Sequence, residues 1–305
     1  MRRGLRGLAL AAAGAAALAA GGCGTPKVGD GTIGADWATF SEPTIAKPDQ
    51  GVCRNGTDDT VDWDIAVLRT SSIGCTSSHL AETYFVGELK TGTTAASPPG
   101  VGDEAFREAY EGCAAAAKDF LGDDFHRAKV SIVPVLPNDK QWKAKSRFYR
   151  CEMFEVKDAG ETIVPRTGSL KDGLRAKKPL GIGCANDKGP DDNTVDAIDF
   201  VACSSAHTVE FSGVYTAPDK AYPGDKAEDD QALNQCERLA ASYLGLTMAA
   251  WDKRTGVAWL YWGGGETNWS VGDRTYRCYV GSLDRKKPIR AGATIRGLGS
   301  KPLPT

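Results

Sequence analysis

Two histidine–glutamate pairs in this chain have the residue types and spacing to bind a ligand or to take part in catalysis. His79 and Glu82 lie in a C-x3-H-x2-E pattern, and His207 and Glu210 lie in a second copy of it. The chain has only three histidines, and two of them occupy this repeated place. A histidine beside a carboxylate can hold a metal ion, sense pH or act as a general base. In the competing structural interpretation, both side chains fix a turn by hydrogen bonding.

The spacing within each pair favours the structural interpretation. Residues i and i+3 of a β-strand point to opposite faces, which disfavours chelation of one ion by both side chains. Four arginines that recur before a later cysteine are candidates to pair with the two glutamates: Arg147, Arg150, Arg274 and Arg277. We therefore predict no catalytic residue, no metal ligand and no cofactor, and keep the two pairs as candidate binding residues.

An aromatic cluster is the second candidate site. Trp251, Trp259, Tyr261 and Trp262 have no aromatic counterparts in the other half of the chain. Trp259 and Tyr261 would share one face of a strand, and Trp262 would lie on the other face, beside the glycines at 263–265, which we expect to be mobile. Such aromatic side chains could stack on a sugar or a partner peptide. Ordinary core packing is the alternative.

The nine cysteines indicate how the chain that carries these candidate residues is cross-linked. Eight fall into two sets of four: Cys53, Cys75, Cys113 and Cys151, then Cys184, Cys203, Cys236 and Cys278. Even sets in an exported chain indicate disulfides. Zinc is the rival, but its cysteine ligands usually come in C-x2-C pairs, which this sequence lacks.

Each set of four cysteines allows three connectivities. We favour the one that joins neighbours in sequence: Cys53–Cys75, Cys113–Cys151, Cys184–Cys203 and Cys236–Cys278. The second bond of each set would then join a helix to the last strand of its half.

The cysteine sets belong to a tandem repeat. A W-x4-R-x-Y-R-C motif begins at Trp142 and again at Trp269, and both tryptophans are expected to pack in the core. The two halves also end alike, with residues 166–174 matching residues 290–298. We predict two domains, at 48–178 and 179–305, preceded by a flexible tether at 23–47 that is rich in Gly, Pro, Thr and Asp.

Each half is expected to contain one main helix and several strands. Apolar residues at helical spacing predict helices over residues 103–121 and about 228–244, ended by Gly122 and Gly245. Strands are predicted at four places and in the segments that end in Cys151 and Cys278: residues 65–68, 130–135, 197–202 and 257–262. The pattern favours an α+β fold with two tandem disulfide-stapled domains, each with one main helix packed on a small, mostly antiparallel sheet.

These motifs resemble the actinobacterial septum formation-related domain family. The second half carries the fuller pattern, with Tyr222-Pro223-Gly224, a helix cysteine before Tyr243-Leu244-Gly245, and Gly272-Asp273-Arg274 before the last cysteine. The first half has Lys145-Ser146 before Arg147 and lacks Tyr-Pro-Gly. The resemblance implies two tandem copies in a lipoprotein with a link to division or cell-wall growth, and it implies no reaction.

The N-terminus has the pattern of an export signal that ends in a lipidated cysteine. Three arginines precede residues 8–20, an Ala- and Leu-rich run too short to span a bilayer. Small residues then lead to Cys23, as in the lipobox of bacterial lipoproteins, although Ala20 stands where leucine is usual. We expect residues 1–22 to be a signal peptide and Cys23 to carry acyl chains. An ordinary signal peptide is the alternative, and the route, Sec or Tat, stays open.

Charge and motif content narrow the function. The net charge of the 305-residue chain is −2, and removing residues 1–22 takes away three arginines and leaves −5, which argues against nucleic acid as a partner. The sequence has no P-loop, no H-E-x-x-H and no G-x-S-x-G. We therefore expect a non-enzymatic binding module, lipid-anchored on the outer face of the cell membrane, with an envelope protein or glycan as partner. The rival is an envelope hydrolase that uses His207 and Glu210 with the aromatic cluster.

Overall fold

The computed structural model describes residues 45–55, 72–191, 194–218 and 220–305. Cys23 and the strand predicted at 65–68 lie outside these residues. The described elements all belong to one compact unit, Thr44–Thr305.

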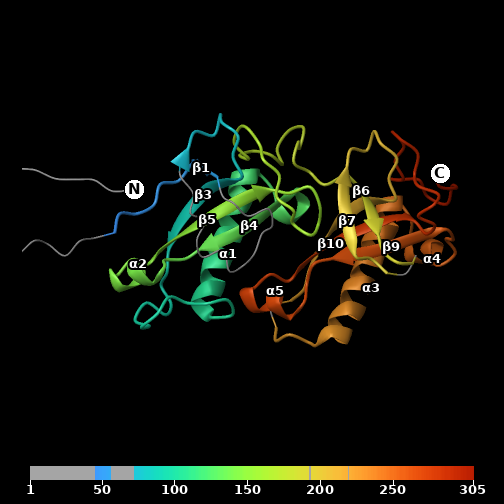
Figure 1. The fold of residues 1–305 in the computed structure, drawn as a ribbon. Helices are drawn as coiled ribbons and strands as arrows, with labels where there is room; N and C mark the ends of the chain where they lie inside the picture. The colour runs from blue at the N-terminus through green and yellow to red at the C-terminus, as the bar shows by residue number, and fades with distance from the viewer. Residues whose placement is uncertain (1–44, 56–71, 192–193, 219) are drawn as a thin grey trace, which may run out of the picture. The chain divides into compact units, whose positions relative to one another are not determined.

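The first half forms a five-stranded antiparallel sheet in the order β2-β1-β3-β5-β4 (Figure 1). Its strands are β1 (Val52–Arg54), β2 (Ser72–Ile73), β3 (Ala81–Glu88), β4 (Val130–Val135) and β5 (Phe148–Glu155). The predicted strand at 130–135 is confirmed as β4, and it lies at one edge of the sheet.

The second half repeats this order of strands as β7-β6-β8-β10-β9. Its strands are β6 (Cys184–Lys188), β7 (Ala197–Val201), β8 (Val209–Thr216), β9 (Val257–Trp262) and β10 (Thr275–Ser282). β9 therefore occupies the edge position that β4 occupies in the first sheet. The predicted strand at 257–262 is confirmed, and the one predicted at 197–202 ends one residue earlier.

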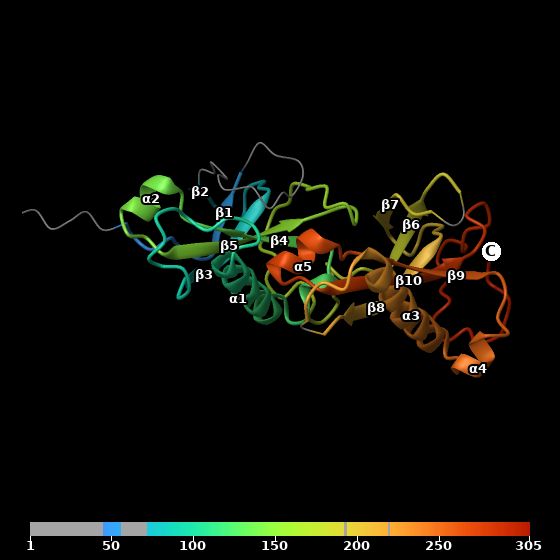
Figure 2. The same ribbon diagram turned by 90° about the horizontal axis from the view of Figure 1, so that it is seen from below.

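One long helix packs on each sheet (Figure 2). α1 (Glu104–Leu121) ends at Gly122 and α3 (Asp225–Leu244) ends at Gly245, and both glycines adopt the left-handed conformation that closes a helix. Both predicted helix ends are confirmed. The shorter helices are η1 (Phe125–Arg127), α2 (Asp139–Lys143), α4 (Met248–Trp251) and α5 (Glu266–Val271). The mixed α+β class is confirmed, while the domain boundaries stay predictions.

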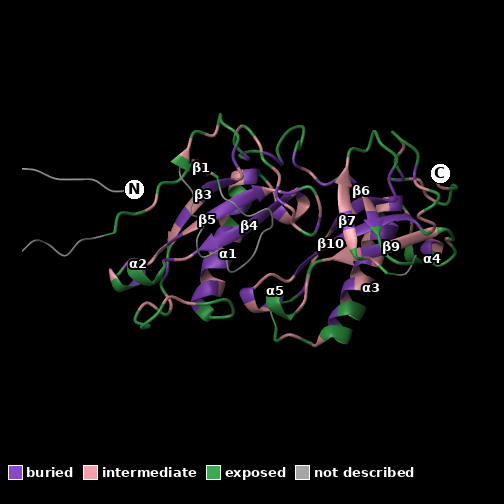
Figure 3. Ribbon diagram, in the orientation of Figure 1, coloured by how far each residue is buried: buried purple, intermediate pink, exposed green. Residues whose placement is uncertain are grey.

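Burial differs between the two long helices (Figure 3). The apolar stripe of α1 lies in the core of the first half, whereas the first turns of α3 are largely exposed and carry Asp225, Asp229 and Asp230. Core packing of Trp142 and Trp269 is confirmed, since both are buried. Each indole N–H donates to a backbone carbonyl, at 2.7 Å and 2.8 Å.

Four disulfides hold the two halves, and they are the pairings expected from the sequence. They are Cys53–Cys75, Cys113–Cys151, Cys184–Cys203 and Cys236–Cys278. Two of them join the long helix of a half to its sheet, and the sulfur-bearing residues of these two bonds are fully buried. The other two join the first strand of each half to the turn that precedes β3 or β8.

We predict that the helix-to-sheet bond of the second half contributes more stability than the bond from β1. Replacing both Cys236 and Cys278 with Ala should lower the free energy of unfolding by about 4 kcal/mol, since the bond closes a long loop. The matched Cys53→Ala, Cys75→Ala variant should lose about 3 kcal/mol. Urea unfolding under oxidising conditions measures both, and equal or reversed losses would contradict the prediction. Non-reducing peptide mapping should find no bond between the halves.

Candidate functional site

The repeated glutamates anchor the chain segment that closes each half. In the first half, the Glu82 carboxylate accepts hydrogen bonds from the Ser169 hydroxyl and the Leu170 N–H, both at 2.7 Å. Glu82 is buried, so these donors replace the water that a carboxylate would otherwise require.

Glu210 makes the corresponding contacts in the second half. It accepts from the Ile295 N–H at 2.9 Å, the Thr294 hydroxyl at 2.8 Å and the Tyr243 hydroxyl at 2.6 Å. Burial and the bond to Glu210 raise the pKa of Tyr243 to about 12. These contacts match Leu170 with Ile295, so the alignment of 166–174 with 290–298 is wrong by one residue at this point.

The prediction that His and Glu point to opposite faces is wrong for the second half. His207 Nε2 lies 3.3 Å from Glu210 Oε1, because His207 precedes β8 and the alternation of a strand does not extend to it. Nδ1 of each repeated histidine bonds a backbone oxygen two residues earlier, at Ser77 and Ser205. The buried Nε2 of His79, in contrast, has no hydrogen-bond partner among the described residues. The repeated pairs are thus turn-fixing groups.

Three of the four arginines predicted to pair with the two glutamates contact other groups. Arg150 pairs with Glu152 at 2.5 Å. Arg147 stacks on the Trp142 ring, 3.6 Å from its centroid, and donates to backbone carbonyls. Arg277 donates across to the first half, as described below. The two glutamates instead accept hydrogen bonds from backbone N–H and hydroxyl groups of the segments that close each half.

Each glutamate lies close to disulfide sulfur. Glu82 lies near Cys53 and Cys75, and Glu210 lies with His207 near Cys184. These cysteines are oxidised, and a metal site of this kind requires thiolate sulfur. The two clusters therefore do not form thiolate metal sites while the disulfides are intact.

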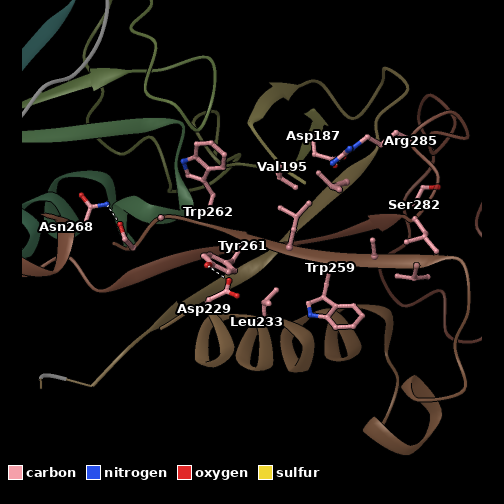
Figure 4. A pocket seen from close by; sticks show the side chains of 17 residues that line it. Asp187, Val195, Asp229, Leu233, Trp259, Tyr261, Trp262, Asn268, Ser282 and Arg285 are labelled. Atoms are coloured by element: carbon pink, nitrogen blue, oxygen red, sulfur yellow. Dashed lines mark hydrogen bonds and ion pairs between the residues drawn. The ribbon is translucent and has the colours of Figure 1, made fainter. Parts of the chain in front are cut away.

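The aromatic cluster lies at an open pocket along β9, which we call the edge pocket. Its volume is about 790 Å³. Figure 4 shows Trp262 on one side of β9 and Trp259 and Tyr261 on the other, next to α3, as the sequence predicted. The lining includes Asp187, Val195, Asp229, Leu233, Leu283 and Arg285. The pocket therefore extends around the free edge of the sheet and is lined from both of its faces.

Two of the aromatic side chains are fixed by contacts with helices. The Trp259 ring packs at 5.4 Å, edge to face, on Trp251 of α4. The Tyr261 hydroxyl donates to Asp229 of α3 at 2.7 Å, and burial and this bond raise the pKa of Tyr261. Trp262 packs against the core cluster that includes Leu260 and Tyr279 but stays half-buried. Trp262 is thus available to a ligand on a surface that is already ordered.

The glycines at 263–265, which were expected to be mobile, have a structural role. All three have positive φ, which favours glycine. Buried Glu228 of α3 accepts the Gly265 N–H at 2.6 Å and the Tyr276 hydroxyl at 2.5 Å. A Cβ on Gly264 would collide with this carboxylate and the tyrosine ring. The glycines let the loop approach Glu228 closely, which fixes one end of the edge pocket.

A smaller polar cavity of about 240 Å³ lies between the halves, and we call it the polar cleft. It shares Trp262, Gly263 and Asn268 with the edge pocket. His126 of the first half bonds Asp124 at 2.7 Å and Asp273 of the second half at 3.1 Å.

Arg277 joins the halves at the same place. It donates to the backbone oxygens of His126 and Val130 at 3.0 Å and 3.1 Å. Together with the bonds of His126, these contacts fasten the second half to the free edge of β4.

The charges of the polar cleft are strongly coupled. Burial alone would lower the pKa of His126, but Asp273 and Asp124 outweigh it and raise the pKa to about 9. His126 in turn lowers the pKa of Asp273, against burial, and bonding to His126 lowers that of Asp124 to about 2. Burial raises the pKa of Glu161, which has positive φ, although Arg277 opposes the shift. His126 is therefore protonated at neutral pH and holds the halves together, and it is not free to act as a general base.

The site residues predicted from the sequence did not include His126, Asp273 or Glu228. His126 is the one histidine outside the repeat, and Asp273 belongs to the motif that the first half lacks. For His126 and Asp273 the departure of one copy from the other was the usable signal, whereas Arg277, which also contacts the other half, has the counterpart Arg150 in the first copy.

Comparison with known proteins gives one family. A family model described as septum formation matches residues 50–278. No curated protein and no solved structure matches the chain. The matched stretch runs through both halves, so the family resemblance is confirmed, whereas two separate copies and an actinobacterial origin stay predictions.

We predict that the free energy of unfolding falls as pH rises through the pKa of His126. That pKa is raised above the ordinary value of about 6.5, so protonation stabilises the folded chain fully below pH ~6.5 and is lost by about pH 9. The expected loss over this range is roughly 2–3 kcal/mol. Urea unfolding at successive pH values measures it.

His126→Gln should flatten this pH dependence, and Asp273→Asn should move it to lower pH. Lys226→Ala, which removes an exposed helix ion pair of α3, is the matched control and should leave the curve unchanged. A wild-type curve that is flat between pH 6.5 and 9 would show that His126 does not clamp the halves.

Proposed function

The chain belongs to the septum formation family, and we propose that it is a non-enzymatic binding protein of the cell envelope. The family supports a role in division or envelope growth. We further propose that Cys23 anchors the chain by lipid to the outer face of the cytoplasmic membrane, with an envelope protein or glycan as the bound partner. The edge pocket of β9 is the observation that carries this proposal.

The edge pocket has the properties of a binding site. Its volume of about 790 Å³ lies within the usual range for ligand pockets. It combines half-buried aromatic side chains with a few polar groups, which is the composition such sites favour. Its glycine loop and its tyrosine are fixed by Glu228 and Asp229, so little ordering would be needed on binding.

The charged groups support binding over catalysis. His207 and Glu210 of the rival hydrolase proposal are buried, and the carboxylate already accepts several hydrogen bonds. His126 is protonated at neutral pH. A hydrolase would need an accessible base close to its working pH.

The cysteine pattern supports the lipid anchor. Of nine cysteines, the eight after Cys23 are all paired in the structure. Cys23 is left over, directly after an export-signal pattern, where a thioether would use its thiol. Among the described residues no helix has the length and hydropathy to cross a bilayer.

We predict that Trp262→Ala weakens capture of the partner about tenfold or more and leaves the fold intact. Half-buried Trp262 borders both cavities, and aromatic residues at such places often dominate an interface. The free energy of unfolding should fall by less than about 2 kcal/mol, against about 3–5 for a fully buried aromatic. Sedimentation with purified cell walls and photo-crosslinking from position 262 in intact envelopes measure capture.

Met248→Ala is the matched control, since Met248 is an exposed apolar residue on α4 that does not line the edge pocket. It should leave capture unchanged. An unfolded Trp262→Ala protein would mean that Trp262 is a core residue, and the absence of any crosslink from position 262 would remove the proposed binding function.

We predict that the mature chain begins at Cys23 and carries acyl chains. Three acyl chains exceed the two signals needed for stable membrane anchoring. Intact-mass measurement of the detergent-extracted protein should show the acyl mass, and Cys23→Ala should release the protein from membranes. A mature chain that starts elsewhere without lipid mass contradicts the anchor and leaves the edge pocket untouched.

A further inference from the structure

The free edge of β9 is an unpaired strand edge inside the edge pocket. Within the described residues β9 pairs with β10 alone. The Leu283 N–H donates to the Gly256 carbonyl, which makes this the first hydrogen-bonded pair of the ladder. Since such pairs alternate, the backbone groups of Val257, Trp259 and Tyr261 point away from β10, toward the pocket.

The equivalent edge of the first half is closed. By the pairing of each strand with its cysteine neighbour, Pro134 of β4 stands where Tyr261 stands in β9. Proline has no N–H, so it blocks strand addition at that place. The Val130 carbonyl of the same edge is already bonded by Arg277. β4 is buried along its whole length, whereas only Leu260 of β9 is buried.

No such device closes β9. Each of its outward positions has an N–H, and no described residue bonds the outward groups of Val257, Trp259 or Tyr261. The buried indole N–H of Trp259 also has no acceptor among the described residues. An unpaired edge of this kind is normally protected by charge, proline or a covering element. Within the pocket these backbone groups are therefore available to pair with another chain.

The two sides of the edge pocket indicate which side chains a segment paired with β9 would carry. On the α3 side, Asp229 accepts a hydrogen bond from Tyr261, so a cation there meets a carboxylate next to an aromatic ring. On the opposite side, Trp262 and Val195 supply apolar surface, next to the Asp187–Arg285 ion pair, whose charges neutralise each other. A strand added to β9 directs alternate side chains to these two sides.

We propose that β9 binds an extended peptide segment of a partner protein by strand addition, with basic and apolar residues in alternation. This rests on the proposed binding function and specifies its ligand. The backbone edge favours a peptide over a glycan, because a glycan cannot form the ladder of N–H and C=O bonds. A second copy of this chain is disfavoured, since pairing β9 with β9 would add another exposed acidic α3 to the same site.

The test uses the purified full-length protein in detergent and a blocked octapeptide of alternating lysine and valine. Binding is measured by calorimetry, and amide hydrogen exchange is followed at residues 257, 259 and 261. We expect the octapeptide to bind and to slow exchange at these amides. A peptide of the same composition with its lysines and valines in two blocks should bind at least about tenfold more weakly.

Two substitutions at one position separate the backbone from the side chain. Tyr261→Pro copies the first half and removes the outward N–H, while Tyr261→Ala removes the same side chain but keeps that N–H. Tyr261→Pro should bind the octapeptide at least about tenfold more weakly than Tyr261→Ala. Should Tyr261→Pro fail to fold, octapeptides N-methylated at the pairing amides, tested on the wild-type protein, make the same comparison.

Equal binding by the two variants, or by the methylated and unmethylated peptides, would overturn strand addition. So would a chitin oligosaccharide that binds at the edge pocket and displaces the octapeptide, since the ligand would then be a glycan. In both cases crosslinking from position 262 in intact envelopes would persist if the proposed binding function holds. Loss of that crosslink as well would mean that the binding function itself has failed.

Discussion

The buried disulfide between helix and sheet is the constraint on which each half of the structure depends. Cys113–Cys151 and Cys236–Cys278 fix a long helix to one face of a five-stranded sheet. Each half is also closed by a C-terminal segment that donates hydrogen bonds to Glu82 or Glu210. With helix and closing segment both fixed, the edge strands β4 and β9 occupy the same position in the two sheets but differ in burial.

The two edge strands differ in sequence and in what they contact. β4 carries a proline, is buried, and accepts a bond from Arg277 of the other half. β9 carries two tryptophans and a tyrosine on an edge that nothing described covers. Under the proposed function, a repeat with one edge used for internal contact and one left open would combine a structural and a binding role in a single compact unit.

The sequence predicted the elements whose formation depends on residues close together in the chain. Both long helices, their terminal glycines, the disulfide pairing and the strands at 130–135 and 257–262 follow from periodicity, left-handed helix ends and cysteine order. The partners of buried charges could not be predicted in the same way. Glu210 accepts hydrogen bonds from Thr294 and Ile295, which are distant in sequence, and His126 bonds Asp273 across the two halves. Such pairs depend on tertiary packing, and no spacing rule specifies them.

The order of the disulfides has a consequence for how the chain is made. From Cys53 onward, the eight cysteines pair in the order in which they occur, the first with the second, the third with the fourth and so on. A chain that enters an oxidising compartment N-terminus first would therefore reach its native connectivity by oxidising cysteines in order of emergence, without reshuffling. Cys23 would emerge before all of them and, with a free thiol, would shift every later pairing by one. Folding by this route requires that the Cys23 thiol be unable to form a disulfide before Cys53 reaches the oxidising compartment.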